Sequence, residues 1–485
     1  MRDTTTTERI LRTALATAAT TSADTILDNG HLERDLGIDS LALAELVTIL
    51  EQRLHVTIPD EETGRLQTVA DVRSLLARLT PSSGTDPTPV SLKRIDPKQR
   101  GFLIVNSHPT GSAATVTRMW EQIPARPDGT SPVVLLLGHS AGYGLATLLT
   151  GLRQHGIRGV GVAYEAPETE RRTASAGWYR TAAAARLAHE NGNDFMFVNT
   201  DAFSDKGKDE VLDLVETRFG KVDYLIYSLA APRRTDPATG TVHHSVIKPL
   251  GQPYEAPALD FSDNTPQVTS VRLEAATDDE RLATEQVMGG ADWQLWIEAL
   301  ADRALLADGF TTAALTYIGS ELTAPIYRQG TIGAAKEHLE RTAGDLTTGV
   351  LAGRGRAFTV VAGAAVTQAS SAIPSIALYT TFLRTVLGDD FRTTTQQAQD
   401  LWDQLTGTAP LLTDGEDRIR LDGWELNPHV QNQVRELWSD PHNGLARSMA
   451  GADWFMGQIR ELYGWGVEGV DYDQPAETTV AWPQP

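Results

Sequence analysis

The sequence predicts an α/β protein in which a doubly wound parallel sheet follows a small all-α bundle of four helices. Three observations support this fold class. Apolar residues recur at helical spacing up to residue 80, a proline-rich segment follows, and apolar runs then alternate with helical stretches. The 485 residues allow roughly two to four domains.

The composition excludes several functional classes. The chain has 42 Lys and Arg against 63 Asp and Glu, a formal charge of −21, whereas nucleic-acid and anionic-membrane surfaces need a basic footprint. It has no cysteine, so disulfides, cysteine-ligated metal sites and thiol nucleophiles are excluded, and we predict no metal site. No apolar run is long enough for a membrane span, and the polar, acid-containing N-terminus is unlike a signal peptide. We therefore expect a cytoplasmic protein that binds no nucleic acid.

Residues 1–80 are predicted to form the helical domain. Apolar residues within Ile10–Leu15 share one helix face, and those within Leu41–Leu50 share another. A further helix opens at Thr68, where Thr68 and Asp71 are placed to cap it. Residues 81–92, with three prolines and no apolar periodicity, are predicted to be a linker to a second domain of residues 93–485.

Apolar runs after the linker predict the strands of the sheet. Val133–Leu137 is unbroken and is followed by glycine, as expected of a strand buried on both faces. Helical stretches separate the runs, which is typical of a parallel, doubly wound sheet. The other runs are Gly159–Tyr164, Phe195–Val198, Tyr224–Tyr227, Thr312–Tyr317 and Ala357–Val361.

A serine at a predicted helix start is the first candidate site. Asp39 and Ser40 precede an apolar periodic run, so either side chain could simply cap that helix. Acidic residues around the serine would suit a basic partner. These are Glu33, Asp35, Asp39, Glu45 and Glu51.

Residues 5–80 resemble an acyl carrier protein, and the likeness centres on Leu36-Gly-Ile-Asp-Ser-Leu41. The resemblance implies that Ser40 carries a covalent 4′-phosphopantetheine arm, whose thiol would hold an acyl group. It also implies a phosphopantetheinyl transferase and other acyl-chain biosynthetic enzymes as partners. A phosphodiester at a helix start lies beside the positive end of the helix dipole.

The second candidate site follows the first predicted strand. Gly138–Gly144 opens a helix, and its glycines permit a tight turn and close approach of the backbone to a pyrophosphate. Glu165 ends the next strand, where a carboxylate would bind a ribose 2′-hydroxyl and favour NADH. Arg171 and Arg172 leave NADPH open, because an arginine can pair with a 2′-phosphate.

Two further segments lie at the carboxyl ends of predicted strands, where such sheets bind ligands. Asp201 and Ala202 follow the third strand, and Leu229 and Ala230 follow the fourth. Asp201 could bind an adenine amino group, but it could equally cap its own loop.

Tyr327 and Lys336 form the third candidate site. On one straight helix their spacing would put them on opposite faces, since each residue turns about 100°. They converge only if the tyrosine precedes the helix, and Gly330 and Gly333 favour such a break with a helix start near Thr331. The ammonium group is then expected to lower the tyrosine pKa. Such a hydroxyl can hydrogen-bond a carbonyl oxygen or deliver a proton.

Residues 93–485 resemble the FabV-type trans-2-enoyl reductases, which include the trans-2-enoyl-CoA reductases. Eight residues separate Tyr327 from Lys336, and this spacing is a mark of that family. Further motifs that carry the resemblance are Arg100-Gly-Phe102, Ala176–Tyr179, Asp201–Ser204, Met288–Gly290, Thr367–Pro374 and Gly466–Tyr472.

The resemblance implies a Rossmann-like fold and reduction of the C2=C3 double bond of a trans-2-enoyl thioester by NADH, in fatty-acid or polyketide-like biosynthesis. It implies that Tyr327 is the proton donor, Lys336 a cofactor contact and Tyr317 a substrate contact. The implied NADH contacts are Gly138, His139, Ser140, Ala141, Gly142, Tyr143, Tyr164, Glu165, Asp201, Ala202, Leu229, Ala230, Lys336, Ala365, Val366 and Thr367.

Several alternatives stay open. The same cofactor and tyrosine would serve a carrier-tethered acyl dehydrogenase or a double-bond isomerase. No second dinucleotide fingerprint follows residue 370, so FAD is not predicted although this part of the family is sometimes labelled FAD-binding. Trp293 and Trp296 could line an acyl channel, but core packing is the stronger expectation.

The fusion itself suggests the substrate. A tether to Ser40 raises the effective concentration of an enoyl group at any site the arm reaches. We therefore hypothesise that the substrate is carried by this chain's own helical domain or by that of a second copy.

Overall fold

The computed structural model describes residues 4–19, 66–79, 92–100, 102–125, 131–261, 265–368 and 373–483, with single positions and runs of two or three residues from residue 26 to residue 58. Ser40 and the predicted linker up to residue 91 lie outside the described residues. The chain divides into two compact units, Met1–Val90 with Thr169–Arg172, and Ser91–Glu168 with Thr173–Pro485. The domain boundaries given above stay a prediction.

The N-terminal unit is helical, as the sequence predicts. Its described helices are α1 (Thr4–Ala18) and α4 (Val69–Leu79). The predicted cap of α4 is confirmed: the Asp71 amide donates to Thr68 Oγ1 at 3.2 Å, and the Thr68 amide donates to Asp71 Oδ2 at 2.9 Å. The core of this unit includes Leu11, Leu15, Leu46, Leu50 and Val72, each at most 1% exposed.

The larger unit is built on a seven-stranded parallel sheet in the order β14-β13-β12-β7-β4-β5-β6. Within this sheet the first strand in the chain is β4. The strands β5 and β6 follow on one side of it, and β7, β12, β13 and β14 follow on the other. This is the doubly wound arrangement, with its topological switch point between β4 and β7. The strands are β4 (Val133–Leu137), β5 (Arg158–Ala163), β6 (Phe195–Asn199), β7 (Val222–Tyr227), β12 (Leu306–Thr316), β13 (Gly355–Val361) and β14 (Ile419–Arg420).

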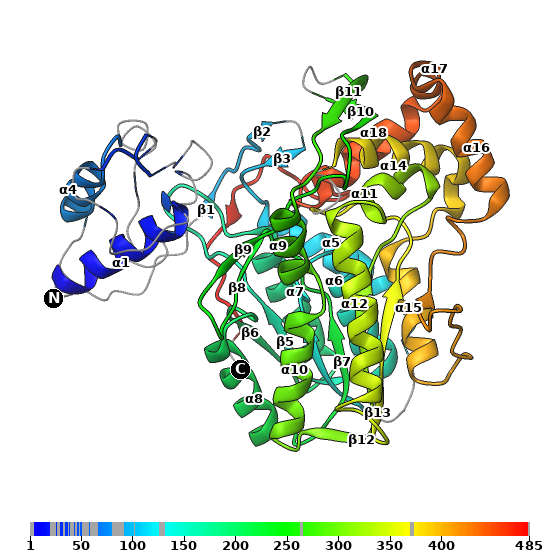
Figure 1. The fold of residues 1–485 in the computed structure, drawn as a ribbon, viewed down its shortest axis with the longest axis horizontal. Helices are drawn as coiled ribbons and strands as arrows, with labels where there is room; N and C mark the ends of the chain where they lie inside the picture. Colours follow the sequence, from blue (N-terminus) through cyan, green and yellow to red (C-terminus); the bar gives the residue numbers. More distant parts are fainter. Residues whose placement is uncertain are drawn as a thin grey trace. The chain divides into compact units, whose positions relative to one another are not determined.

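Helices cover both faces of this sheet (Figure 1). Because side chains alternate along a strand, Val133, Leu135 and Leu137 pack into one core while Val134 and Leu136 pack into the other. One face is covered by α8 (Asp205–Arg218), α10 (Ala291–Asp302) and α12 (Thr331–Thr348). The other is covered by α5 (Pro109–Glu121), α6 (Gly142–His155), α7 (Ala176–Glu190) and α15 (Thr394–Leu405).

The tryptophans considered as an acyl channel belong to the first of these cores. Trp293 and Trp296 are both 0% exposed. The Trp293 indole N–H donates to Thr312 Oγ1 at 2.8 Å, and that of Trp296 donates to the Ala202 carbonyl at 3.1 Å. Both are packing residues, so the acyl-channel alternative is not supported.

Several elements depart from the six predicted strands. The two-residue β14 adds a seventh strand, and antiparallel hairpins β8–β9 and β10–β11 lie outside the main sheet. Their strands are β8 (Arg233–Thr235), β9 (Val242–His244), β10 (Tyr254–Asp260) and β11 (Gln267–Leu273). The remaining short strands are β1 (Leu92–Lys93), β2 (Gln99–Arg100), β3 (Leu103–Ile104) and β15 (Ala476–Glu477).

The other helices include two short ones before α12, namely the 3-10 helix η2 (Glu321–Thr323) and α11 (Ala324–Tyr327). The remainder are α9 (Asp278–Met288), α14 (Pro374–Leu387), η3 (Gly388–Asp390), α16 (Pro428–Ser439), α17 (Pro441–Ala446) and α18 (Met449–Glu461). Within the described part of the chain, every helix is too short or too polar to cross a lipid bilayer.

Candidate active site

A glycine turn joins β4 to α6 at the switch point of the sheet. Gly138 has φ +88° and Gly142 has φ +51°, conformations that favour glycine. A Cβ on Gly138 would lie 2.3 Å from the Ser228 carbonyl oxygen, and one on Gly144 would lie 1.9 Å from the Gly138 carbonyl oxygen. The glycines therefore let the loop fold tightly against β7 and leave backbone facing the helix start, as a pyrophosphate site requires.

Glu165 is fixed at the end of β5 beside this turn. Its carboxylate accepts hydrogen bonds from Ser140 Oγ at 2.5 Å and from Ser175 Oγ. Its amide donates to Asn199 Oδ1 at 2.7 Å. A Cβ on Gly177 would lie 2.0 Å from Glu165 Oε1, so the first turn of α7 packs directly on the carboxylate. The proposed ribose-binding group is thus joined to the glycine turn through Ser140.

The loop after β6 is held by the buried side chain of Lys208 and by a hydrogen bond of its own. Lys208 Nζ donates to the carbonyls of Ala202 at 3.0 Å and Phe203 at 3.1 Å. Asp201 Oδ1 accepts from the Phe203 amide at 3.0 Å, so Asp201 caps its own loop, the alternative that the sequence left open. That contact engages one carboxylate oxygen, and adenine binding by Asp201 stays a prediction.

Other predicted cofactor residues border the same turn. A Cβ on Gly142 would lie 3.3 Å from Thr367 Cγ2, which places Thr367, after β13, against the start of α6. His139 is 0% exposed and its ring packs edge-on against Phe197, and burial lowers its pKa to about 4. Its side chain is therefore a neutral packing group, and only its backbone is left for a ligand.

Tyr327 and Lys336 converge as the sequence predicts. Tyr327 ends the short helix α11, and the chain breaks at Gly330 before α12 begins at Thr331. Lys336 Nζ then lies 5.7 Å from the centroid of the Tyr327 ring and donates to Thr316 Oγ1 at 3.2 Å.

The expected lowering of the tyrosine pKa is wrong. Burial, reinforced by the negative charge of Glu425, raises the pKa of Tyr327 above its usual value. Burial also lowers the pKa of Lys336 to about 8. Desolvation is the largest cause of this shift, so Tyr327 keeps its proton at neutral pH and is placed to donate it.

Tyr317 and Glu425 complete the site. The rings of Tyr317 and Tyr327 are 4.8 Å apart at an interplanar angle of 85°. The Tyr317 hydroxyl donates to Glu425 Oε1 at 2.8 Å, and Glu425 is 0% exposed. Glu425 is not among the residues predicted from the sequence. A carboxylate just after a strand is the usual signal, but β14 spans only Ile419–Arg420 and has no readable periodicity.

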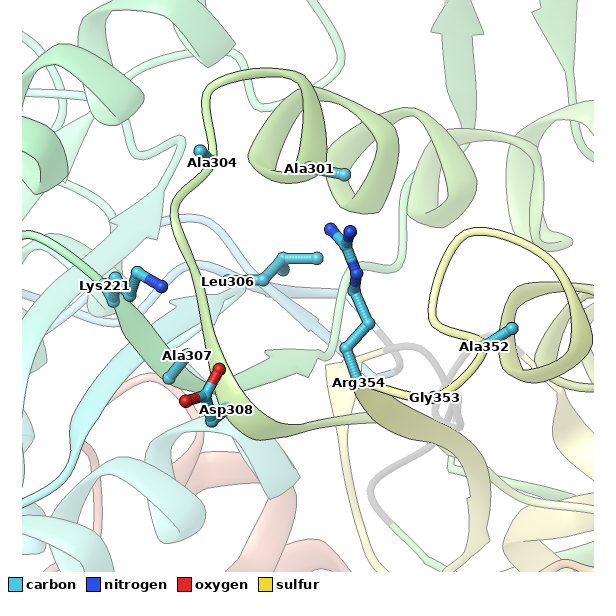
Figure 2. A pocket seen from close by; sticks show the side chains of 9 residues that line it. All are labelled: Lys221, Ala301, Ala304, Leu306, Ala307, Asp308, Ala352, Gly353 and Arg354. Carbon is cyan, nitrogen blue, oxygen red and sulfur yellow. The ribbon is translucent and has the colours of Figure 1, made fainter.

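The residues of this site follow the carboxyl ends of β4, β7, β12 and β13, which is where doubly wound sheets bind ligands. A separate pocket lies at the other end, beside the amino ends of β7 and β12. Figure 2 shows Leu306 between Lys221 and Arg354 in that pocket. It contains none of the predicted site residues.

Models of known families match most of the chain. Residues 172–406 match the trans-2-enoyl-CoA reductase catalytic region, and residues 94–170 match the NAD(P)H binding domain of trans-2-enoyl-CoA reductase. Residues 413–476 match the enoyl reductase FAD binding domain, and residues 9–76 match a phosphopantetheine attachment site. Residues 413–476, all described, contain β14 and three helices but no second strand–glycine–helix unit, so we still expect no FAD.

Individual relatives match about four fifths of the chain and nearly their own full length. An enoyl-acyl-carrier-protein reductase (NADH) of Streptomyces avermitilis is 51% identical over 391 residues, which are 80% of this chain and 99% of that protein. A trans-2-enoyl-CoA reductase (NADH) of Clostridium perfringens is 39% identical over 390 residues, 80% of this chain and 99% of that protein. The crystal structure of Treponema denticola trans-2-enoyl-CoA reductase in complex with NAD has a TM-score of 0.73 at 35% identity and covers 79% of this chain and 98% of that one.

Proposed function

This chain belongs to the trans-2-enoyl-CoA reductase family, and we propose that it reduces the C2=C3 double bond of a trans-2-enoyl thioester carried by its own helical domain or by that of a second copy. NADH is the reductant, and 4′-phosphopantetheine is the covalent group of the carrier domain. The observation that carries the proposal is the convergence of Tyr327 and Lys336 at the sheet end that holds the glycine turn.

The glycine turn fits a dinucleotide because Gly138 and Gly144 have no side chains. A Cβ at either position would clash with neighbouring backbone atoms and force the turn open. We propose that the backbone of Gly138–Tyr143 holds the pyrophosphate and that Glu165 binds the adenosine ribose. Asp201, Ala202, Leu229 and Ala230, with the segment Ala365–Thr367, would complete the site. When bound, NADH supplies a hydride to the substrate.

Tyr327 would act on the thioester. Negative charge develops on the carbonyl oxygen as Cβ receives the hydride, and a hydrogen bond from the Tyr327 hydroxyl stabilises it. Tyr327, which is protonated at neutral pH, then supplies the proton that Cα needs. The Lys336 ammonium, 5.7 Å from the ring, stabilises the phenolate until solvent returns a proton. The balance is one hydride and one proton for each double bond.

The carrier domain would supply the substrate through an arm on Ser40. A flexible chain of the length of the predicted linker, a dozen residues, would span on the order of 20 Å, and the arm would add further reach. We propose delivery within one chain or between two copies, and a dilution series distinguishes the two. Phosphopantetheinyl transferase and other acyl-chain enzymes would be partners, in fatty-acid or polyketide-like biosynthesis in the cytoplasm.

Intact mass spectrometry tests tethered reduction. The chain is converted to its phosphopantetheine form, loaded with a short trans-2-enoyl group and incubated with NADH. We expect the carrier-bound acyl group to gain two hydrogen atoms, and we expect Ser40→Ala to accept no arm. A dilution series separates delivery within a chain from delivery between copies. An unchanged mass with NADH retained would favour an isomerase, and an unchanged mass beside reduction of free enoyl-CoA would leave the carrier to another enzyme.

Gly144→Ala is expected to weaken NADH binding about tenfold or more. The new Cβ would lie 1.9 Å from the Gly138 carbonyl oxygen, and forcing the turn open costs roughly 1–3 kcal/mol, where 1.4 kcal/mol is tenfold. Titration of NADH fluorescence measures the affinity. Gly344→Ala in α12 is the matched control, since its Cβ would meet nothing within 4 Å. Equal affinities of the two variants would contradict the role of the turn.

A further inference from the structure

Glu425 is a buried carboxyl group at the active site, in the segment between β14 and α16. Its Oε1 accepts hydrogen bonds from the hydroxyls of Tyr317 and Tyr379, both at 2.8 Å, and its Oε2 accepts from the Ala364 amide at 2.6 Å. None of the ion pairs formed by described residues includes Glu425, although it is 0% exposed. A charged carboxylate without a cation is costly in such a place.

The two tyrosines that contact Glu425 are not equivalent. The Tyr379 oxygen accepts from Gln431 Nε2 at 3.0 Å, and the same amide group donates to the Glu425 carbonyl at 2.8 Å. Gln431, on α16, therefore holds the Tyr379 hydroxyl in the orientation in which it donates to Glu425. Among the described residues, the hydrogen-bond partner of the Tyr317 hydroxyl is Glu425, and its ring lies 4.8 Å from Tyr327. Tyr317 is the tyrosine whose hydroxyl can change partner.

The position of a proton on Glu425 decides which partner Tyr317 takes. The Ala364 N–H already points at Oε2, so Oε1 is the oxygen that would carry the proton. A proton on Oε1 is donated to the Tyr317 oxygen, because Gln431 holds Tyr379 with its own O–H directed at Oε1. The Tyr317 O–H must then turn away from Glu425, toward Tyr327 and the substrate.

We propose that Glu425 is a positioning residue: when neutral it directs the Tyr317 hydroxyl to the thioester carbonyl beside Tyr327, and when charged it holds that hydroxyl to itself. The inference rests on the proposed reductase function. Glu425 returns to the same protonation state after each turnover, so the hydride and proton balance of the reaction is unchanged.

The surroundings of Glu425 set the sign of the pH dependence. Burial, opposed by the hydrogen bonds from Tyr317 and Tyr379, raises its pKa to about 7. Tyr143 on α6 donates its hydroxyl to the Gly363 carbonyl, and Asp422 pairs with Arg420 at 2.6 Å. Besides burial, the charge of Glu425 raises the pKa of Tyr327. A charged Glu425 therefore removes one donor and weakens another, and activity falls as pH rises through about 7.

Glu425→Gln mimics the neutral acid. Its carbonyl oxygen can accept from the Ala364 amide while its NH₂ group donates to Tyr317. The measurement is kcat/KM for crotonyl-CoA with NADH against pH, on the full chain. We expect the wild type to lose activity above pH about 7 and again above about 8, where Lys336 loses its charge. The variant should show only the second loss of activity. Its ratio of kcat/KM at pH 8 to kcat/KM at pH 6 should therefore be about tenfold higher than that of the wild type.

Two tyrosine variants complete the test. Tyr379→Phe removes one donor to the carboxylate, so the pKa of Glu425 should rise and the first fall should move to higher pH. Tyr317→Phe removes the hydroxyl that changes partner, so its activity should be low. Mainly the weaker effect of the Glu425 charge on Tyr327 then remains, and the loss of activity near pH 7 should be shallower. A wild-type profile in Glu425→Gln overturns the proposal. So does an equal loss of its activity at all pH values.

Chemical denaturation provides a readout that does not depend on turnover. The folded carboxyl group has a pKa of about 7 and an unfolded one about 4.3, so the folded chain binds more protons between these values. This group therefore makes the wild type less stable as pH rises from about 4.3 to 7. The stability of Glu425→Gln relative to wild type should increase across that window, and a constant difference overturns the proposal. A wild type that oxidises NADH neither with crotonyl-CoA nor with a crotonyl group loaded on its own arm refutes the reductase function instead.

Discussion

Replacing Tyr327 by phenylalanine is expected to lower kcat for enoyl reduction by about 10²–10⁴-fold, the usual contribution of a general acid. The ring would keep its edge-on contact with Tyr317 and its place 5.7 Å from Lys336 Nζ, so the loss isolates the hydroxyl. Steady-state turnover of crotonyl-CoA with NADH measures kcat, and fluorescence titration measures NADH affinity, which should stay the same.

Tyr224→Phe is the matched control for that variant. Its hydroxyl donates to the Leu405 carbonyl at 3.2 Å, away from the site, and its loss should change kcat by less than about twofold. A Tyr327→Phe enzyme within tenfold of the wild type would show that another group delivers the proton.

Asp292→Ala is expected to lower the free energy of unfolding by about 3–5 kcal/mol. Asp292 is 1% exposed, and Lys208 Nζ donates to its Oδ1 at 2.6 Å inside the core. The Tyr227 hydroxyl donates to Oδ2 at 3.2 Å. Removing the carboxylate leaves a buried ammonium without its anion, and the Ala202 loop that Lys208 holds is loosened. Urea denaturation followed by circular dichroism measures the change.

An exposed ion pair offers the comparison. Arg186 and Glu190 are each 54% exposed on α7, and pairs of this kind contribute less than about 1 kcal/mol. Glu190→Ala should therefore cost a small fraction of what Asp292→Ala costs. Similar losses in the two variants would mean that the Lys208–Asp292 pair does not stabilise the core as described.

The sheet could be predicted because its central strands are buried on both faces. Val133–Leu137 is an uninterrupted apolar run with every residue buried, and such runs are visible without knowledge of their partners. The β10–β11 hairpin was not predicted because β10 contains Pro257 and β11 alternates weakly, so neither has the pattern of a buried strand. The strand β14, with two residues, is too short for any pattern.

The residues of the site likewise divide into those with a local sequence pattern and those without one. The glycine turn and the Tyr327–Lys336 pair are local in sequence, and the spacing of the pair, together with Gly330 and Gly333, predicted a break before α12. The contact between Glu425 and Tyr317 joins positions 108 residues apart, so no sequence window contains it. The predicted direction of the Tyr327 pKa shift was wrong. Burial decides this shift, and burial comes from tertiary packing. The attachment of phosphopantetheine to Ser40 stays a prediction.

The long span of the Tyr317–Glu425 contact has a consequence for biosynthesis of the chain itself. A ribosome adds on the order of 5–20 residues each second, so Glu425 emerges seconds to tens of seconds after Tyr317. Until then the nascent sheet lacks β14 and Tyr317 lacks its acceptor. The helical domain is complete far earlier. The carrier is thus made before the catalyst, and a chain that stalls before residue 425 would display a carrier beside an unfinished reductase.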